Sequence, residues 1–111
     1  MTAGAKLAQH LPAPGIALST AQQHLVRQLI DSVLPGARVA VFGSRATGRA
    51  RPYSDLDLLL LDPPVLSWTQ RADLHDAFEA SALPFRVDVV ELAGLAEGMA
   101  ERVMGEACQL P

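Results

Sequence analysis

The chain has 111 residues, of which 50% are hydrophobic and 19% charged, so it is one folded domain rather than a disordered chain or two domains. Its formal net charge of −3 argues against a nucleic-acid binder that works through a broad basic surface. The single cysteine, Cys108, excludes an internal disulfide, and without a leader-like start or an apolar run of membrane length the chain is expected to be cytoplasmic.

The N-terminal part divides into an arm and a helix. Residues 1–18 are rich in Ala, Pro and Gly, which predicts a flexible N-terminal arm and leaves residues 19–111 as the domain. Ser19 followed by Gln22 forms a capping box that starts a helix. Apolar residues then recur at helical spacing until Pro35-Gly36 ends the helix.

Two apolar runs in the middle of the chain predict strands, each with a chemical feature at one end. Residues 38–42 lead into Gly43-Ser44, a tight turn before a short helix, whose amides and hydroxyl suit phosphate oxygens. The second strand runs from about Asp55 to Leu61. Alternate residues of a strand point to one face, so we expect Asp55 and Asp57 to lie roughly 6.5 Å apart.

The C-terminal part is predicted to contain a helix over about 67–82, a strand over 85–91 and a helix over about 92–104 that Gly105 ends. A strand–helix–strand crossover makes the second and third strands parallel. The short link between the first two strands permits an antiparallel pair. We therefore expect an α/β (α+β) fold with a small mixed β-sheet flanked by helices.

Asp88 turns the Asp-x-Asp pattern into a candidate metal site. An isolated Asp-x-Asp is usually a strand-end or turn feature, and Asp88 alone is equally consistent with capping a turn or pairing with Arg86 or Arg38. An ionised carboxylate in a strand is costly unless it is paired or bound to metal. If the third strand neighbours the second, three carboxylates gather at one sheet edge. Such a set holds two Mg²⁺ ions about 3.5–4 Å apart for in-line phosphoryl or nucleotidyl displacement.

A phosphate-binding Walker loop is the alternative reading of the glycine turn. Gly43 and Gly48 have the spacing of that motif, but the motif continues with Lys-Ser or Lys-Thr. Here Arg49-Ala50 follow, so both the phosphate-binding lysine and the magnesium-binding hydroxyl are missing. The Walker interpretation is rejected.

Three segments together resemble the DNA polymerase beta nucleotidyltransferase superfamily. They are residues 41–48 (VFGSRATG), 54–58 (SDLDL) and 87–90 (VDVV). More closely, the chain is similar to the minimal nucleotidyltransferases (MNT), which serve as antitoxins beside HEPN-domain partners. The resemblance covers about residues 19–110 and implies a polymerase-beta-like nucleotidyltransferase fold. The chain departs from many relatives at Thr47, where they carry Arg.

By this resemblance, Asp55, Asp57 and Asp88 are the catalytic and metal-binding residues. The first two would bind both Mg²⁺ ions, and Asp88 would bind the catalytic ion and favour deprotonation of the attacking hydroxyl. Gly43 and Ser44 would hold the phosphates of ATP, and Arg45 would help neutralise them.

The resemblance also implies a partner. Larger relatives carry an added domain that grips their acceptor, and no residues remain here for one, so another macromolecule is expected to present the hydroxyl. The implied function is transfer of AMP from ATP to a hydroxyl, expected to be a tyrosine, of a HEPN toxin. Two alternatives stay open: an antitoxin that blocks its partner by binding alone, and an enzyme that modifies a small molecule or nucleic acid.

Overall fold

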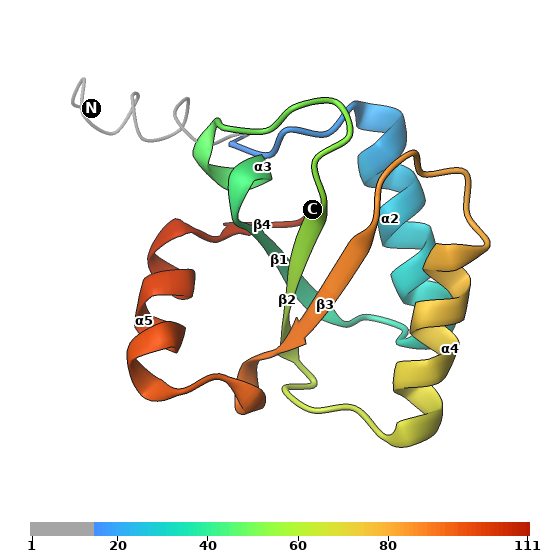
Figure 1. Cartoon of the computed structure of the whole chain (residues 1–111). Coiled ribbons are helices and arrows are strands. Elements are labelled where there is room, and N and C mark those ends of the chain that lie inside the picture. The colour runs from blue at the N-terminus through green and yellow to red at the C-terminus, as the bar shows by residue number, and fades with distance from the viewer. Residues whose placement is uncertain (1–14) are drawn as a thin grey trace, which may run out of the picture.

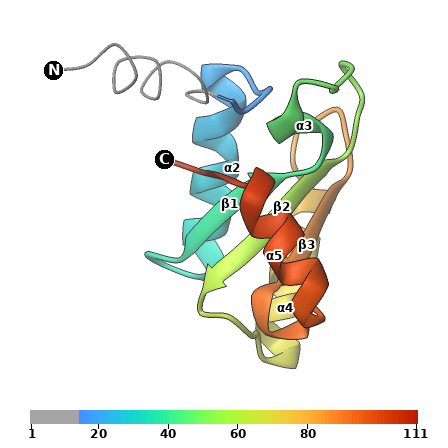
Figure 2. The same ribbon diagram turned by 90° about the vertical axis from the view of Figure 1, so that its left-hand side faces the viewer.

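A computed structural model describes residues 15–111 and has three layers, with helices on both faces of one sheet (Figure 1). Helices α2 and α4 cover one face, and α5 covers the other, in front of the sheet in Figure 2. The elements are α2 (Thr20–Val33), β1 (Arg38–Phe42), α3 (Ser44–Thr47), β2 (Leu56–Asp62), α4 (Trp68–Glu79), β3 (Val87–Glu91), the 3₁₀ turn η1 (Leu92–Gly94), α5 (Glu97–Glu106) and β4 (Cys108–Gln109).

The sheet is mixed and has the strand order β3-β2-β1-β4. β1 runs antiparallel to β2 and β4, whereas β2 and β3 are parallel, as the crossover through α4 requires. The predicted fold class and the pairing of the first three strands are therefore confirmed. β3 is an edge strand of this sheet.

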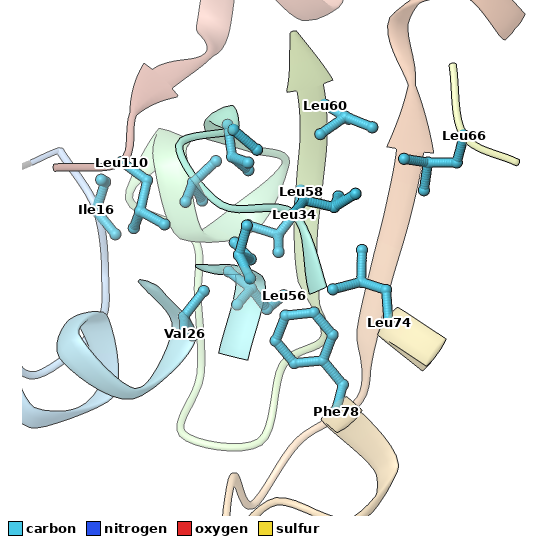
Figure 3. Close-up of a cluster of buried hydrophobic side chains, with 14 residues drawn as sticks. Ile16, Val26, Leu34, Leu56, Leu58, Leu60, Leu66, Leu74, Phe78 and Leu110 are labelled. Atoms are coloured by element: carbon cyan, nitrogen blue, oxygen red, sulfur yellow. The ribbon is translucent and has the colours of Figure 1, made fainter. Parts of the chain in front are cut away.

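Each face of the sheet has its own apolar core. The larger core joins β2 to α2 and α4, and Leu56, Leu58, Leu74 and Phe78 are among its members (Figure 3). The smaller core packs Val103 of α5 against the opposite face. In β2, alternate residues enter opposite cores, which explains why this strand is apolar almost throughout. None of the helices within residues 15–111 is long and apolar enough to cross a membrane.

The C-terminal region differs most from its predicted structure. The expected helix over 92–104 is wrong in its bounds: η1 forms first, and α5 begins only after Ala96. Gly105 does not end the helix, because α5 continues through Glu106. The strand β4 was not predicted. The helix expected over 67–82 ends at Glu79, and the strand expected from residue 85 begins at Val87.

Part of the expected N-terminal arm packs against the domain. Ile16 is buried in the larger core, and the amide of Ala17 donates to the carbonyl of Arg45 at 2.7 Å. Ile16 and Leu18 are the apolar residues that make this packing favourable. Residues 15–18 are therefore part of the folded unit, and the remainder of the predicted arm, residues 1–14, lies outside the described residues.

Candidate active site

The turn between β1 and α3 requires glycine on two counts. Gly43 has φ 72° and ψ −151°, a backbone conformation that is essentially restricted to glycine. A Cβ atom at this position would also overlap Oδ2 of Asp57 and approach its Cγ to 3.3 Å. The absence of a side chain therefore lets Gly43, which immediately precedes the first residue of α3, Ser44, lie directly against one of the predicted metal-binding carboxylates.

The sheet register brings the predicted site residues together. Phe42, next to Gly43, lies opposite Asp57 in the β1–β2 pair, and Asp57 lies opposite Asp88 in the β2–β3 pair. Asp55 directly precedes β2. The glycine turn and all three carboxylates thus meet at one end of three adjacent strands, as expected from the sequence.

The three acids share a site with little positive charge to stabilise them. The pKa of Asp57 is raised, first because the carboxyl is partly buried and then because Asp88, Asp55 and Glu106 add negative charge nearby. Glu106 comes from α5, and the sequence pattern did not indicate that it lies near Asp57. An added cation would relieve this repulsion.

Arg86 is the basic residue that reaches the acids. Its Nη2 atom lies 3.5 Å from Oδ2 of Asp55 and 3.7 Å from Oδ2 of Asp88. Of the two pairings open to Asp88 from sequence, the one with Arg86 forms. Within residues 15–111, the other one does not form: Arg38 lies opposite Asp62, at the far end of β2.

The donor set fits magnesium in kind, because Mg²⁺ prefers carboxylate oxygens completed by waters and substrate phosphates. The guanidinium between Asp55 and Asp88 is a cation standing between two of the predicted ligands. In the described part of the chain, however, no three acidic, histidine or cysteine side chains converge closely enough to surround one ion. Metal binding at this site would therefore require small side-chain movements.

Arg45 has a different environment from the one expected for a phosphate-binding residue. It is only 4% exposed, and its guanidinium donates to the carbonyl oxygens of Ser54 at 2.8 Å and Ala17 at 2.6 Å. It also stacks over the ring of Phe85, 4.0 Å from the centroid. Arg45 therefore anchors the loop that carries Asp55, and its contact with phosphates stays a prediction.

A hollow of about 490 Å³ opens beside the acids, between α4 and the start of β3. Phe78 and Phe85 contribute aromatic walls, and Arg86 and Asp88 form the side nearest the carboxylates. Across the sheet the order is thus the glycine turn, the Asp55–Asp57 pair, Asp88 and then the hollow. A phosphate donor and an acceptor can therefore approach the acids from opposite sides.

Comparison with known proteins also indicates a nucleotidyltransferase. Residues 25–108 match the family model "Nucleotidyltransferase domain". The chain is also 38% identical, over 77 residues, to the "Probable protein adenylyltransferase MntA" of Haemophilus influenzae. That alignment spans 69% of this chain and 68% of the relative.

Solved structures show a similar fold. A "putative minimal nucleotidyltransferase" is 40% identical with a TM-score of 0.61, over 79% of this chain and 88% of the other. A chain of a toxin–antitoxin crystal structure with AMP-PNP is 27% identical with a TM-score of 0.66, over 80% and 72% of the two chains. The α/β architecture with a mixed four-stranded sheet is therefore that of the polymerase-beta-like nucleotidyltransferases.

Proposed function

The chain belongs to the nucleotidyltransferase domain family and is an MntA-like minimal nucleotidyltransferase of toxin–antitoxin systems, and we propose a specific reaction for it. It transfers AMP from ATP to a hydroxyl group, in our proposal that of a tyrosine, on a partner HEPN toxin. By modifying the toxin in this way, the chain acts as the antitoxin of the pair. The relative named as a probable protein adenylyltransferase and the toxin–antitoxin structure with AMP-PNP support this proposal.

The residues divide into three roles. Gly43 and Ser44 bind the phosphates of ATP through backbone amides and a hydroxyl. Asp55 and Asp57 hold two Mg²⁺ ions, and Asp88 completes the set as a ligand of the catalytic ion. When bound, magnesium neutralises the phosphate oxygens and the charge that develops during transfer.

The transfer itself is a substitution at the α-phosphorus of ATP. The acceptor oxygen forms a bond to that phosphorus while the bond to the bridging oxygen breaks, and pyrophosphate leaves. The hydroxyl proton passes to the carboxylate of Asp88, which lies on the side of the hollow. The glycine turn holds the leaving group on the opposite side, so the attack is in line.

One observation carries the proposal. The Asp57 carboxylate lies where a side chain at Gly43 would be, and Asp57 also pairs in register with Asp88 on β3. The phosphate-binding turn, the metal ligands and the proton acceptor therefore share one small volume. A protein that only binds its partner has no need for three repelling carboxylates at this point.

The test is a transfer assay with full-length chain, purified partner toxin, Mg²⁺ and ATP labelled at the α-phosphate. We expect label on the toxin with wild-type chain and none with Asp57→Asn, which keeps the shape and removes the charge. Asp62→Asn, at the other end of the same strand, is the matched control and retains transfer. If the toxin is neutralised without any label, the chain acts by binding and the proposed reaction is wrong.

A further inference from the structure

Arg86 links two of the acids that the proposed function assigns to metal. It lies directly before β3 with its side chain 73% exposed, and its guanidinium contacts Asp55 and Asp88 through the same nitrogen, Nη2. Asp55 directly precedes β2 and Asp88 lies in the neighbouring strand β3, so the contact bridges the site. No other basic side chain in residues 15–111 forms an ion pair with Asp55, Asp57 or Asp88.

A guanidinium and a divalent cation compete for such a position. Both are attracted by the same oxygens, and they repel each other when they lie a few ångströms apart. Arg86 is exposed and its two contacts are long, so releasing them costs little. The hollow that Arg86 lines gives the displaced side chain a place to move to.

We infer that Arg86 is the resident counter-ion of the carboxylate cluster, and that a divalent cation must displace it to bind. This inference rests on the proposed function, because it takes Asp55 and Asp88 as metal ligands. Arg86 is thus a positioning residue: it offsets the repulsion between the acids when no metal is bound, and it sets the metal affinity of the site. It also explains why the acids do not yet surround a single point.

The experiment measures Mn²⁺ binding to the full chain, without nucleotide, by electron paramagnetic resonance of the free ion. Arg86→Gln removes the competing charge, so we expect Mn²⁺ to bind about fivefold more tightly than to wild type. Arg86→Lys keeps a charge and stays close to wild type. Arg49→Gln is the matched control, because Arg49 is an exposed arginine of the loop before Asp55, and it leaves the affinity unchanged.

Unchanged or weaker Mn²⁺ binding by Arg86→Gln, with wild type binding the ion, would overturn the inference and leave the proposed function intact. If wild type and Asp57→Asn both fail to bind Mn²⁺, the metal site of the proposed function and the inference are both wrong. A second readout is the thermal unfolding temperature: Arg86→Gln should unfold at a lower temperature than wild type without Mn²⁺ and gain more on its addition. A constant difference between the two proteins would contradict displacement.

Discussion

Asp88 and Glu91 lie three positions apart on the same strand, β3, yet the two acids have opposite environments. Glu91 accepts hydrogen bonds from the amide of Leu66 at 2.7 Å and from Arg71 at 2.8 and 2.9 Å. Its pKa is lowered, first by the hydrogen bonds from Arg71. Asp88 has one ion-pair contact, at 3.7 Å to Arg86, and faces Asp57, whose pKa is raised.

The two acids show how one sheet can separate residues that stabilise the fold from residues that remain available for chemistry. At the Glu91 end, the carboxylate ties β3 to the start of α4 and its hydrogen-bonding capacity is used within the chain. At the Asp88 end, carboxylate oxygens remain available and repel one another, which costs stability but suits a site for cations. Substitutions at the two ends are therefore expected to have different consequences.

The largest effect is expected on catalysis at the Asp88 end. Asp88→Asn removes the proposed proton acceptor and a metal ligand, and should lower the transfer rate at least about 100-fold. Its free energy of unfolding should stay within about 0.5 kcal/mol of wild type, since only an exposed ion pair is lost. Single-turnover transfer and urea unfolding measure the two quantities. A rate within tenfold of wild type would remove Asp88 from the mechanism.

Gly43→Ala is expected to damage both stability and activity. The positive φ strains alanine, and its Cβ would collide with the Asp57 carboxylate, so we expect a loss of about 2–3 kcal/mol in the free energy of unfolding. Gly36→Ala is a useful control, because Gly36 also has a positive φ but meets no atom within 4 Å. Equal losses in the two variants would show that the close approach to Asp57 does not matter.

Glu91→Ala should affect stability without affecting chemistry. It leaves the amide of Leu66 and the guanidinium of Arg71 without their acceptor, for an expected loss of about 1 kcal/mol. Urea unfolding provides the measurement. Transfer per folded molecule should equal that of wild type, and a specific loss of activity in fully folded protein would break the separation between the two ends.

The smallest expected effect is the pH dependence of unfolding in metal-free buffer, and it has opposite signs at the two ends. The folded-state pKa of Glu91 is lowered, so its stabilisation is complete above its ordinary value of 4.5 and is lost as the pH falls through the folded value. That of Asp57 is raised above 3.8, so its contribution is complete below 3.8 and is lost as the pH rises through the folded value.

Urea unfolding between pH 3 and 7 separates these contributions. With rising pH, Asp57→Asn should gain stability relative to wild type, whereas Glu91→Gln should lose stability relative to wild type. Each difference should be a fraction of the roughly 1.4 kcal/mol that corresponds to one pKa unit, because solvent screens both groups. Parallel curves for the two variants would contradict the opposite assignments.

The sequence predicted the end of the sheet that carries the glycine turn and the three acids better than it predicted the contacts that stabilise the fold. The Gly43 turn and the Asp55–Asp57 pair follow from local patterns, and the crossover rule then places Asp88 beside them. The ion pair of Arg71 with Glu91 joins residues far apart in the chain, so no local pattern indicates it. The same reason explains why the burial of Arg45 was missed, since its acceptors come from two separate segments.

Local signals also failed at the C-terminus. The strand β4 has only two residues, and it exists because Val41 pairs with Cys108 across the chain. No side chain of the described residues caps α5 at Ala96, so its start had no sequence signature. Gly105 resembles a helix stop, but packing of Val103 in the smaller core holds the last turn together.

The most direct test of the separation between stability and chemistry is the unfolding of Asp57→Asn with and without Mg²⁺. In metal-free buffer we expect this variant to be at least as stable as wild type, because it removes a repelling charge. With saturating Mg²⁺, wild type should gain stability through ligand binding and overtake the variant, which should gain little. If Asp57→Asn is the less stable protein without metal and responds to Mg²⁺ like wild type, Asp57 serves the fold and not the metal.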